Sequence, residues 1–496
     1  MSKSKNGEMP LFDEVDNNGD LPEGWAKVAI PKIANIHSGQ TPSGIKDSLQ
    51  ASGDIPWFKV GDMNRAGNER FMDNGENFLT NESVESLRMR IFPPNTLIFP
   101  KRGGAIATNK KRMLRSPACL DLNIMALVLP EEYASYCWWW FQTIDLARLS
   151  DGSNVPQINN RHIVPLKIPL APLPEQKRIV SKIEELFSDL DAGVSALERA
   201  RANLRRYRAS VLKSAVEGRL TQKWRSANPD VEPASELLAR ILRERRQRWE
   251  QQQLTTYESK GKKPPKNWQT KYKEPVEPDQ RNLPEVPDGW AVASMDQLTE
   301  IITSGSRAWS KYYGSGTGTF IMAQNVRPGR LDLNFRQPVN PPEGDRDRTR
   351  SQIKLGDLLV TIVGANTGDV CRVPEELPEH YVCQSVALMR PVDASISEYL
   401  ETYFVADEGA QKQFEKYIYG AGRPHLSFDQ LKMTAILLPP LSEQHAVLEA
   451  SESRFPSIDH TDAMLRTNLA RANRLRQGIL KSAFEGNLTA ACLNGG

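Results

Sequence analysis

The sequence has little cysteine and no long apolar run. Five cysteines occur in 496 residues, at positions 119, 137, 371, 383 and 492, and none forms a Cys-x-x-Cys pair. This excludes a disulfide framework or a cysteine-ligated zinc site as the organising feature, and it is typical of a reducing cytosol. No stretch approaches the ~20 apolar residues of a membrane span, and the N-terminal segment lacks the apolar core of a signal peptide. We therefore expect a cytoplasmic protein that does not use a membrane.

A large excess of charge of one sign is also missing. The chain has 64 Lys and Arg against 61 Asp and Glu, so its formal net charge is only +3. Any binding to nucleic acid must therefore come from local basic patches and not from a global field. The hydrophobic content of 39% and the charged content of 25% are ordinary, and the length suits two or three domains with their own cores.

Motifs that carry catalysis are absent as well. The six histidines show no metal-ligand spacing, and no Ser, Cys or His stands in a recognisable nucleophile motif. The Gly-rich stretch at 314–318 is followed by no Gly-Lys-Ser/Thr, which argues against a nucleotide site. Residues 339–342 read Val-Asn-Pro-Pro, close to the motif by which amino-methyltransferases hold a flipped base, but Glu343 replaces the aromatic residue. These absences predict a chain with no catalytic site, metal or cofactor of its own.

What the sequence does contain is a long internal repeat. Residues 172–221 begin PLPEQ and close on LKSAVEGRLT, and residues 440–489 begin PLSEQ and close on LKSAFEGNLT. Adding 268 to each number superposes the two segments without a gap, and 19 of the 50 positions are then identical. The chain is therefore organised around two related segments.

Each copy predicts one long helix. In the first copy, roughly 60 Å long if helical from Glu175 to Ala215, apolar residues recur at alternating spacings of three and four, as in a coiled coil. That seam consists of Ile183, Leu186, Leu190, Gly193, Leu197, Ala200, Leu204, Tyr207 and Val211. The thinner second seam consists of Ile458, Leu465, Ala472, Leu475 and Ile479. Pro456 predicts a kink or a late helix start, and Gly218 and Gly486 are expected helix ends. The two seams should pack antiparallel as a stalk.

The repeat extends into the segments before each helix. Trp25 closes an LPEGW motif and Trp290 a VPDGW motif, and short apolar runs after Asn95 and Gly356 predict buried strands. Helical pieces are expected at 133–149 and 397–417. The fold class predicted is α+β: two globular strand-rich domains joined by two long antiparallel coiled-coil helices, with an internal two-fold repeat. The aromatic run at 138–141 could supply base-stacking platforms or pack in a core, and the sequence leaves both open.

These patterns define the domain boundaries. The connector should contain a helix capped by Ser235, with its apolar residues on one side, followed by a basic linker. The expected parts are a flexible arm (1–20), a first domain (21–171), a first helical region (172–224), a connector (225–285), a second domain (286–439), a second helical region (440–489) and a tail (490–496).

Basic clusters in the two domains are the candidate nucleic-acid contacts. Lys and Arg suit phosphate, and Arg, Asn and Gln can read base edges in the major groove. A solvated charged surface is the alternative. The candidates of the first domain are Lys59, Arg65, Lys101, Arg102, Lys110, Lys111, Arg112 and Gln157. Those of the second are Arg307, Lys311, Gln324, Asn325, Arg327, Arg330 and Arg423.

The alternation of variable domain and repeated helix, with its PLPEQ…LKSA-EG-LT and PLSEQ…LKSA-EG-LT borders, resembles the specificity subunit of Type I restriction-modification enzymes. The resemblance covers residues 21–489. It implies that each globular part is a target-recognition domain for one half of a split site in double-stranded DNA. It also implies a subunit that is not itself catalytic, which agrees with the missing motifs.

The resemblance implies partners and where they bind. Two methyltransferase subunits, which bind S-adenosylmethionine, would dock on the helices, and two restriction or motor subunits, which use ATP and Mg, would join them. The exposed faces of both helices are the expected docking sites, with surface ion pairing as the alternative role. The residues expected there are Arg205, Arg206, Arg208, Arg474 and Arg476.

Helix length should set the distance between the two half-sites, which we expect to lie about one DNA turn, ~34 Å, apart. Deleting one heptad from both helices is therefore expected to shorten the spacer of the recognised site, as mapped by DNA methylation. Methylation of a site with an unchanged spacer would contradict this.

Two other functions fit parts of the pattern. A stand-alone DNA methyltransferase would bind S-adenosylmethionine as the isolated chain, and Glu343 and the missing glycine-rich motif argue against it. A coiled-coil scaffold would bind protein partners. Its affinity would lack the steep dependence on ionic strength that phosphate contacts produce.

Overall fold

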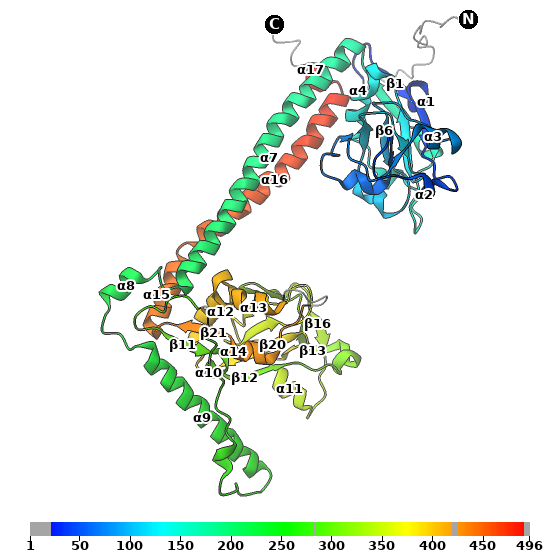
Figure 1. Cartoon of the computed structure of the whole chain (residues 1–496). Helices are drawn as coiled ribbons and strands as arrows, with labels where there is room; N and C mark the ends of the chain where they lie inside the picture. The colour runs from blue at the N-terminus through cyan, green and yellow to red at the C-terminus, as the bar shows by residue number, and fades with distance from the viewer. Residues whose placement is uncertain (1–20, 282, 419–423, 491–496) are drawn as a thin grey trace, which may run out of the picture. The chain divides into compact units, whose positions relative to one another are not determined.

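The computed structural model describes residues 21–281, 283–418 and 424–490, and it divides into two compact units. Unit 1 comprises Met1–Glu198 and Arg466–Gly496, and unit 2 comprises Arg199–Leu465. Each unit holds one strand-rich domain and a segment of each long helix (Figure 1). Within the described ranges, no helix combines the length and the apolar character needed to cross a bilayer.

The domain of unit 1 contains two sheets. The larger has the strand order β2-β9-β6-β7-β4, and the smaller has the order β5-β3-β8, with β3 antiparallel to β5 and parallel to β8. The strands of both are β2 (Asn35–Ser38), β3 (Ile55–Phe58), β4 (Phe71–Met72), β5 (Phe78–Leu79), β6 (Leu97–Pro100), β7 (Arg112–Leu114), β8 (Cys119–Leu120) and β9 (Ile124–Val128). A separate antiparallel pair, β1 (Ala26–Ala29) with β10 (Lys167–Leu170), joins the two ends of the domain.

The domain of unit 2 repeats this plan. Its sheets have the orders β12-β20-β17-β18 and β16-β13-β19, and β13 is again antiparallel to one neighbour and parallel to the other. The strands are β12 (Thr299–Ser304), β13 (Tyr313–Ile321), β16 (Gln337–Val339), β17 (Leu358–Thr361), β18 (Val370–Arg372), β19 (His380–Val382) and β20 (Val386–Pro391). The pair β11 (Ala291–Ser294) with β21 (Ala435–Leu438) closes the domain, and β14 (Val326–Arg327) and β15 (Arg330–Leu331) form a hairpin. The internal repeat predicted from the sequence is confirmed.

Short helices connect these strands. In unit 1 they are α1 (Ile30–Ile33), α2 (Ile45–Ser48), η1 (Val60–Asn64), α3 (Asn81–Ser86), η2 (Gly103–Thr108), α4 (Glu131–Phe141), α5 (Leu146–Leu149) and α6 (Asn160–Ile163). In unit 2 they are α10 (Met295–Leu298), η4 (Trp309–Tyr312), α11 (Arg346–Ser351), η5 (Ala394–Ile396), α12 (Ser397–Val405), η6 (Asp407–Gln411), α13 (Lys412–Ile418) and α14 (Phe428–Met433). The helical pieces expected at 133–149 and at 397–417 are thus both present, and each is interrupted.

Both buried strands predicted from short apolar runs are confirmed. Every residue of β6 and of β17 is buried, so the two strands form the centre of their sheets. Each strand follows a residue with a left-handed backbone, Asn95 (φ 63°) and Gly356 (φ 83°). Asn and Gly adopt this conformation at low cost, which explains the turn that starts each strand.

The aromatic run of α4 belongs to the packing of unit 1. Trp138, Trp140 and Phe141 are buried in the core, and Trp139 packs edge-to-face on Phe187 of the long helix, with ring centroids 5.0 Å apart. Edge-to-face pairs of this kind stabilise a core beyond the area they bury. These rings therefore hold the domain on its helix, and the base-stacking reading of them is wrong.

The repeated segments form the long helices. The first is α7 (Leu173–Val216), and the second is divided into α15 (Leu441–Glu452) and α16 (Phe455–Phe484). Of the two outcomes predicted from Pro456, the structure thus shows an interruption of the helix and not a late start, because α15 begins at the position equivalent to the start of α7. A short α17 (Asn487–Ala490) follows. Gly218 and Gly486 have φ of 70° and 79°, as expected of residues that stop a helix.

The helices pair antiparallel in each unit, but the predicted seam is displaced by one residue at Tyr207 and at Leu475. In unit 2, Arg208 pairs with Asp459 (Nη1 to Oδ1, 2.5 Å) and its guanidinium lies 4.7 Å from the Phe455 ring. In unit 1, Arg476 pairs with Asp191 and lies 5.5 Å from the Phe187 ring. Adding 268 converts 191 to 459, 187 to 455 and 208 to 476, so the contacts are reciprocal.

The displaced positions have a common cause. Tyr207 and Leu475, both assigned to the seam, are 50% and 47% exposed. The inward positions belong instead to Arg208 and Arg476, whose aliphatic stems cover apolar surface while the charged groups pair with the opposite helix. A search for apolar letters cannot find a seam position that is filled by arginine.

The connector also differs in one detail from the prediction. After α8 (Gln222–Ala227), its helix α9 runs from Ala234 to Ser259, with Pro233 and not Ser235 at the N-cap position. Proline fits here because it fixes a backbone angle suited to the helix start and the first turn needs no internal donor. The apolar side predicted for this helix is confirmed, since Leu237 and Ile241 are buried in the core of unit 2. A short turn, η3 (Trp268–Lys271), follows.

Candidate nucleic-acid interface

Four of the predicted cations of unit 1 gather around η1. The buried Asp62 organises this turn, because its carboxylate accepts hydrogen bonds from the Lys59 backbone (2.8 Å) and from Arg65 Nε (3.0 Å). Arg112 reaches the same turn by donating from Nη2 to the carbonyl of Met63 (3.0 Å), and Lys110 donates to Asn64. We call Lys59, Arg65, Lys110 and Arg112 the η1 cluster. Its basic groups remain partly exposed, which suits contact with phosphate.

A buried amide next to this cluster was missed by the sequence reasoning. Asn68 is fully buried, and its amide nitrogen donates to the carbonyls of Asp62 and Asn74 (both 2.8 Å). Its oxygen accepts from the backbone of Asp73 and Asn74. These bonds satisfy both ends of the amide and fix the loop that follows η1. Asn68 is therefore a positioning residue for the cluster.

A second group lies in the first domain, where the loop after α5 meets the loop after β6. Gln157 forms an isolated β-bridge with Arg102, and the backbone of Ile158 donates to the Lys101 carbonyl (2.8 Å). Lys101 Nζ donates to Ser38 Oγ (2.9 Å), and partial burial lowers the pKa of this lysine. The structure thus brings Lys101, Arg102 and Gln157 together. The sequence predicted each of them as a contact but did not predict that they are neighbours.

Lys111 does not belong to the interface, and its prediction as a DNA contact is wrong. Its side chain is 2% exposed and donates from Nζ to the carbonyl of Ile144 (2.5 Å) and to Asn109 Oδ1 (3.0 Å). Burial lowers its pKa to about 8, against a raising effect from Asp145. Lys111 points inward between two outward neighbours, so it stabilises a loop and cannot reach a ligand.

The lowered pKa of Lys111 predicts a pH dependence of stability. The group is protonated in both states below pH 8, whereas between about 8 and 10.5 only the unfolded chain still holds the proton. The free energy of unfolding should therefore rise with pH in this window, by up to about 1.4 kcal/mol per unit. Denaturation at several pH values should show this rise in the wild type and in Lys110→Met but not in Lys111→Met. Equal slopes in all three would contradict it.

The predicted cations of unit 2 occupy two adjoining places. Arg327 and Arg330 face each other across the β14–β15 hairpin, whose turn contains Gly329 with φ of 67°. Arg330 pairs with Asp332 (3.2 Å). Arg307 and Lys311 are exposed on either side of the buried Trp309, and Gln324 is exposed in the loop before the hairpin. All five side chains are accessible or partly so.

Asn325 is not accessible, and its prediction as a base reader is wrong. It is fully buried, and its amide nitrogen donates to the carbonyls of Asp332 (2.8 Å) and Phe335 (2.7 Å) while its oxygen accepts from Met322. A buried amide satisfied on all sides has nothing left for a base. Asn325 thus plays the part in unit 2 that Asn68 plays in unit 1. The predicted reader Arg423 lies outside the described residues.

The residues predicted for partner docking divide into two groups. Arg208 and Arg476 pair with the opposite helix, as described above, which is the alternative role of surface ion pairing, and their contact with a partner stays a prediction. Arg205, Arg206 and Arg474 are exposed and leave an outward basic face on each helix. Within the part of the chain that the structure describes, no group of three or more His, Cys, Asp or Glu side chains could hold a metal ion.

The chain is similar in sequence to known proteins. Residues 22–199 and 343–450 match the family model of the Type I restriction modification DNA specificity domain. The chain is 24% identical over 490 residues to the Type I restriction enzyme EcoKI specificity subunit of Escherichia coli K12, covering 95% of this chain and 91% of that protein. It is 26% identical to the Escherichia coli EcoBI specificity subunit, covering 96% and 89%.

One solved structure is similar in fold. A chain from work on complex assembly and conformational transition of the type I R-M system aligns with a TM-score of 0.62 at 14% identity, covering 94% of this chain and 99% of that one. This similarity establishes the fold and nothing further.

Proposed function

Since the chain belongs to the Type I restriction modification DNA specificity family, we propose that its two strand-rich domains each read one half of a bipartite DNA site. DNA recognition for a Type I restriction-modification system is the role of this family and of this chain. The observation that carries the proposal for two half-sites is the repeat of one sheet plan, with basic side chains exposed in both copies. The two domains differ in sequence, so we expect two different half-sites.

The contacts are divided by chemistry. We assign phosphate contacts to the η1 cluster, Lys101 and Arg102 in the first domain, and to Arg307, Lys311, Arg327 and Arg330 in the second. Gln157 and Gln324 remain the candidates for base reading, because an exposed amide can pair with adenine. The domain boundaries derived from the sequence remain part of this proposal.

Partners should supply the chemistry. We propose that two methyltransferase subunits dock on the basic helix faces around Arg205, Arg206 and Arg474, and that two restriction or motor subunits join them. S-adenosylmethionine would then be bound by the methyltransferase, and ATP and Mg by the motor subunit. This chain would be the non-catalytic part of the enzyme, and its location in the cytoplasm remains a prediction.

The test is methylation mapping of DNA from cells that express this chain with its neighbouring methyltransferase, compared with the methyltransferase alone. A bipartite methylated motif that needs this chain is the expected result. A stable complex that produces no new motif would contradict the proposal and favour a scaffold for protein ligands.

A further inference from the structure

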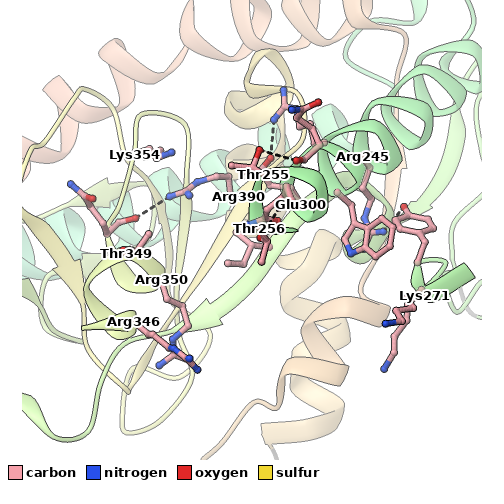
Figure 2. Close-up of a pocket in the computed structure, with 18 residues that line it drawn as sticks. Arg245, Thr255, Thr256, Lys271, Glu300, Arg346, Thr349, Arg350, Lys354 and Arg390 are labelled. Carbon is pink, nitrogen blue, oxygen red and sulfur yellow. Dashed lines mark hydrogen bonds and ion pairs between the residues drawn. The ribbon is translucent and has the colours of Figure 1, made fainter. Parts of the chain in front are cut away.

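A basic cavity of about 1130 Å³ lies between the connector helix α9 and the second domain, entirely within unit 2 (Figure 2). Of its 18 lining residues, eight are Lys or Arg and only one, Glu300, is acidic. One wall is α9, the second is the return segment 271–273, and the third is α11 with the loop after it. We call this cavity the connector groove.

Four of its cations are used by the fold. Arg390 binds Asp357 through both carboxylate oxygens (2.8 and 2.7 Å), and Arg248 pairs with Glu300 (2.9 Å). Arg245 donates to the carbonyl of Thr299 (2.9 Å) and to the Tyr272 hydroxyl (2.7 Å), and Arg350 pairs with Asp347 (2.8 Å). These contacts fix the walls, and the pair with Arg248 neutralises the single acidic residue.

The other four cations have no such use. Lys271, Lys273, Arg346 and Lys354 are all exposed, and within the described ranges none of them forms an ion pair or a side-chain hydrogen bond. They come from different walls, so the free charge is spread along the groove and does not converge on one point. Cations that line one groove repel one another, and an extended anion would relieve that repulsion.

A hydrogen bond connects one wall of the groove to the segment that carries two of the proposed phosphate contacts of the second domain. Asp345, which caps α11, accepts a hydrogen bond from Trp309 Nε1 (3.2 Å), and Trp309 lies between the proposed phosphate contacts Arg307 and Lys311. Figure 2 shows Arg346 and Arg350 extending from α11 to the same side. The short helix α11 therefore lines the groove and is held at its N-cap by Trp309, which lies between Arg307 and Lys311 in the sequence.

We propose that the connector groove binds the sugar-phosphate backbone of duplex DNA flanking the half-site read by the second domain. This inference rests on the proposed function and extends it to a contact independent of sequence. The groove offers ammonium and guanidinium groups with the hydroxyls of Thr255, Thr256 and Thr349. These are the donors that phosphate needs, whereas an acidic protein segment would also need apolar pockets. The apolar lining is limited to Ile301 and the rings of Trp249 and Tyr272, which pack on each other.

The test uses the complex of the full chain with its methyltransferase subunits and duplexes that contain the mapped target. Each duplex carries ~20 bp outside one half-site, about two helical turns, or is trimmed there to ~3 bp. The wild type should bind the long flank at least ~10-fold more tightly on one side only, with a steeper salt dependence, by ~2 to 4 in log–log slope. The variant with Lys271, Lys273, Arg346 and Lys354 changed to alanine should lose this preference and keep the same methylated motif.

A matched control is provided by the same connector. Lys260, Lys262, Lys263 and Lys266 are exposed and do not line the groove, so changing all four to alanine removes the same charge and should leave the flank preference intact. A groove variant that keeps the wild-type preference would overturn the proposal. Loss of the methyltransferase from the groove variant alone would also overturn it and identify a protein occupant. A wild-type complex without specific duplex binding would instead refute the proposed function, before any variant is compared.

Discussion

Replacing the η1 cluster, that is Lys59, Arg65, Lys110 and Arg112, by alanine is expected to lower the affinity of the assembled complex for all duplexes alike, on the order of 100-fold at physiological salt. Each cation removed takes away one phosphate contact and the counterions it releases. The log–log slope of affinity against salt should become shallower by about 3 to 4. Fluorescence anisotropy with specific and scrambled duplexes over a salt series measures both quantities.

The control for this prediction changes an equal charge elsewhere in unit 1. Lys32, Lys46, Arg148 and Lys177 are exposed and distant in sequence from η1, so their joint replacement by alanine should have a small effect. Because Arg65 also binds Asp62, unfolding of each variant should be measured in parallel. A change in the preferred bases, at unchanged affinity, would mean that the cluster reads sequence and does not merely hold phosphate.

The second large effect is expected at Glu443, whose carboxylate is completely buried. It accepts hydrogen bonds from Thr221 Oγ1 (2.6 Å), Arg225 Nη2 (2.8 Å) and Trp290 Nε1 (2.9 Å). Glu443→Ala leaves these buried donors unpaired, so the free energy of unfolding should fall by about 3 to 5 kcal/mol. Denaturant unfolding of the full chain, followed by tryptophan fluorescence, measures the loss.

Two further variants make the Glu443 prediction specific. Glu449→Ala removes an exposed carboxylate from the same helix and should change stability by less than about 0.5 kcal/mol. Glu443→Gln keeps an acceptor, so its free energy of unfolding should lie between those of Glu443→Ala and Glu449→Ala. Equal stabilities of Glu443→Ala and Glu449→Ala would show that the buried contacts contribute nothing net.

Unit 1 contains an equivalent hydrogen bond, which explains why the Trp and the Glu occur in both repeats. Trp25 Nε1 donates to Glu175 Oε2 (3.1 Å), as Trp290 does to Glu443. Thr489, at the end of the second repeat, donates to Glu175 at the start of the first (3.3 Å). The end of one repeated segment therefore meets the beginning of the other, which an antiparallel pairing requires.

The glycines that end the helices also contact the opposite repeat. A Cβ on Gly486 would lie 2.1 Å from Pro22 Cγ, and one on Gly218 would lie 2.7 Å from Pro287 Cγ. Together with the left-handed backbone of both residues, this close approach excludes a side chain. The prolines belong to the LPEGW and VPDGW motifs, so each motif packs on the helix end of the other repeat.

The sequence predicted the fold because a repeat of 50 residues carries its own register. A spacing of 268 relates the two helices, whereas the two buried strands are 261 residues apart (97 to 358) and the paired tryptophans 265 residues apart (25 to 290). It did not predict which partner each residue would meet. Glu175 and Glu443 were visible as repeated letters, but their bonds to the opposite repeat depend on tertiary structure.

Single residues of the interface were harder to predict, for a physical reason. Lys111 stands between two partly exposed cations and Asn325 follows the exposed Gln324, yet loop geometry turns both inward, where internal carbonyls satisfy their donors. The direction of a side chain in a loop has no period in the sequence. The connector groove was missed for a related reason, because its cations come from separate segments between Arg245 and Arg390.

The crossing of the two repeats also has a consequence for biosynthesis. Unit 2 is continuous in sequence, whereas unit 1 includes α16 residues from the far end of the chain, and Leu480, Ala483 and Phe484 lie in the core of the first domain. During translation, the first domain would therefore finish folding last, because it needs α16. The second domain could fold before it. A nonsense mutation near position 470 would thus impair recognition of the half-site that we propose for the N-terminal domain.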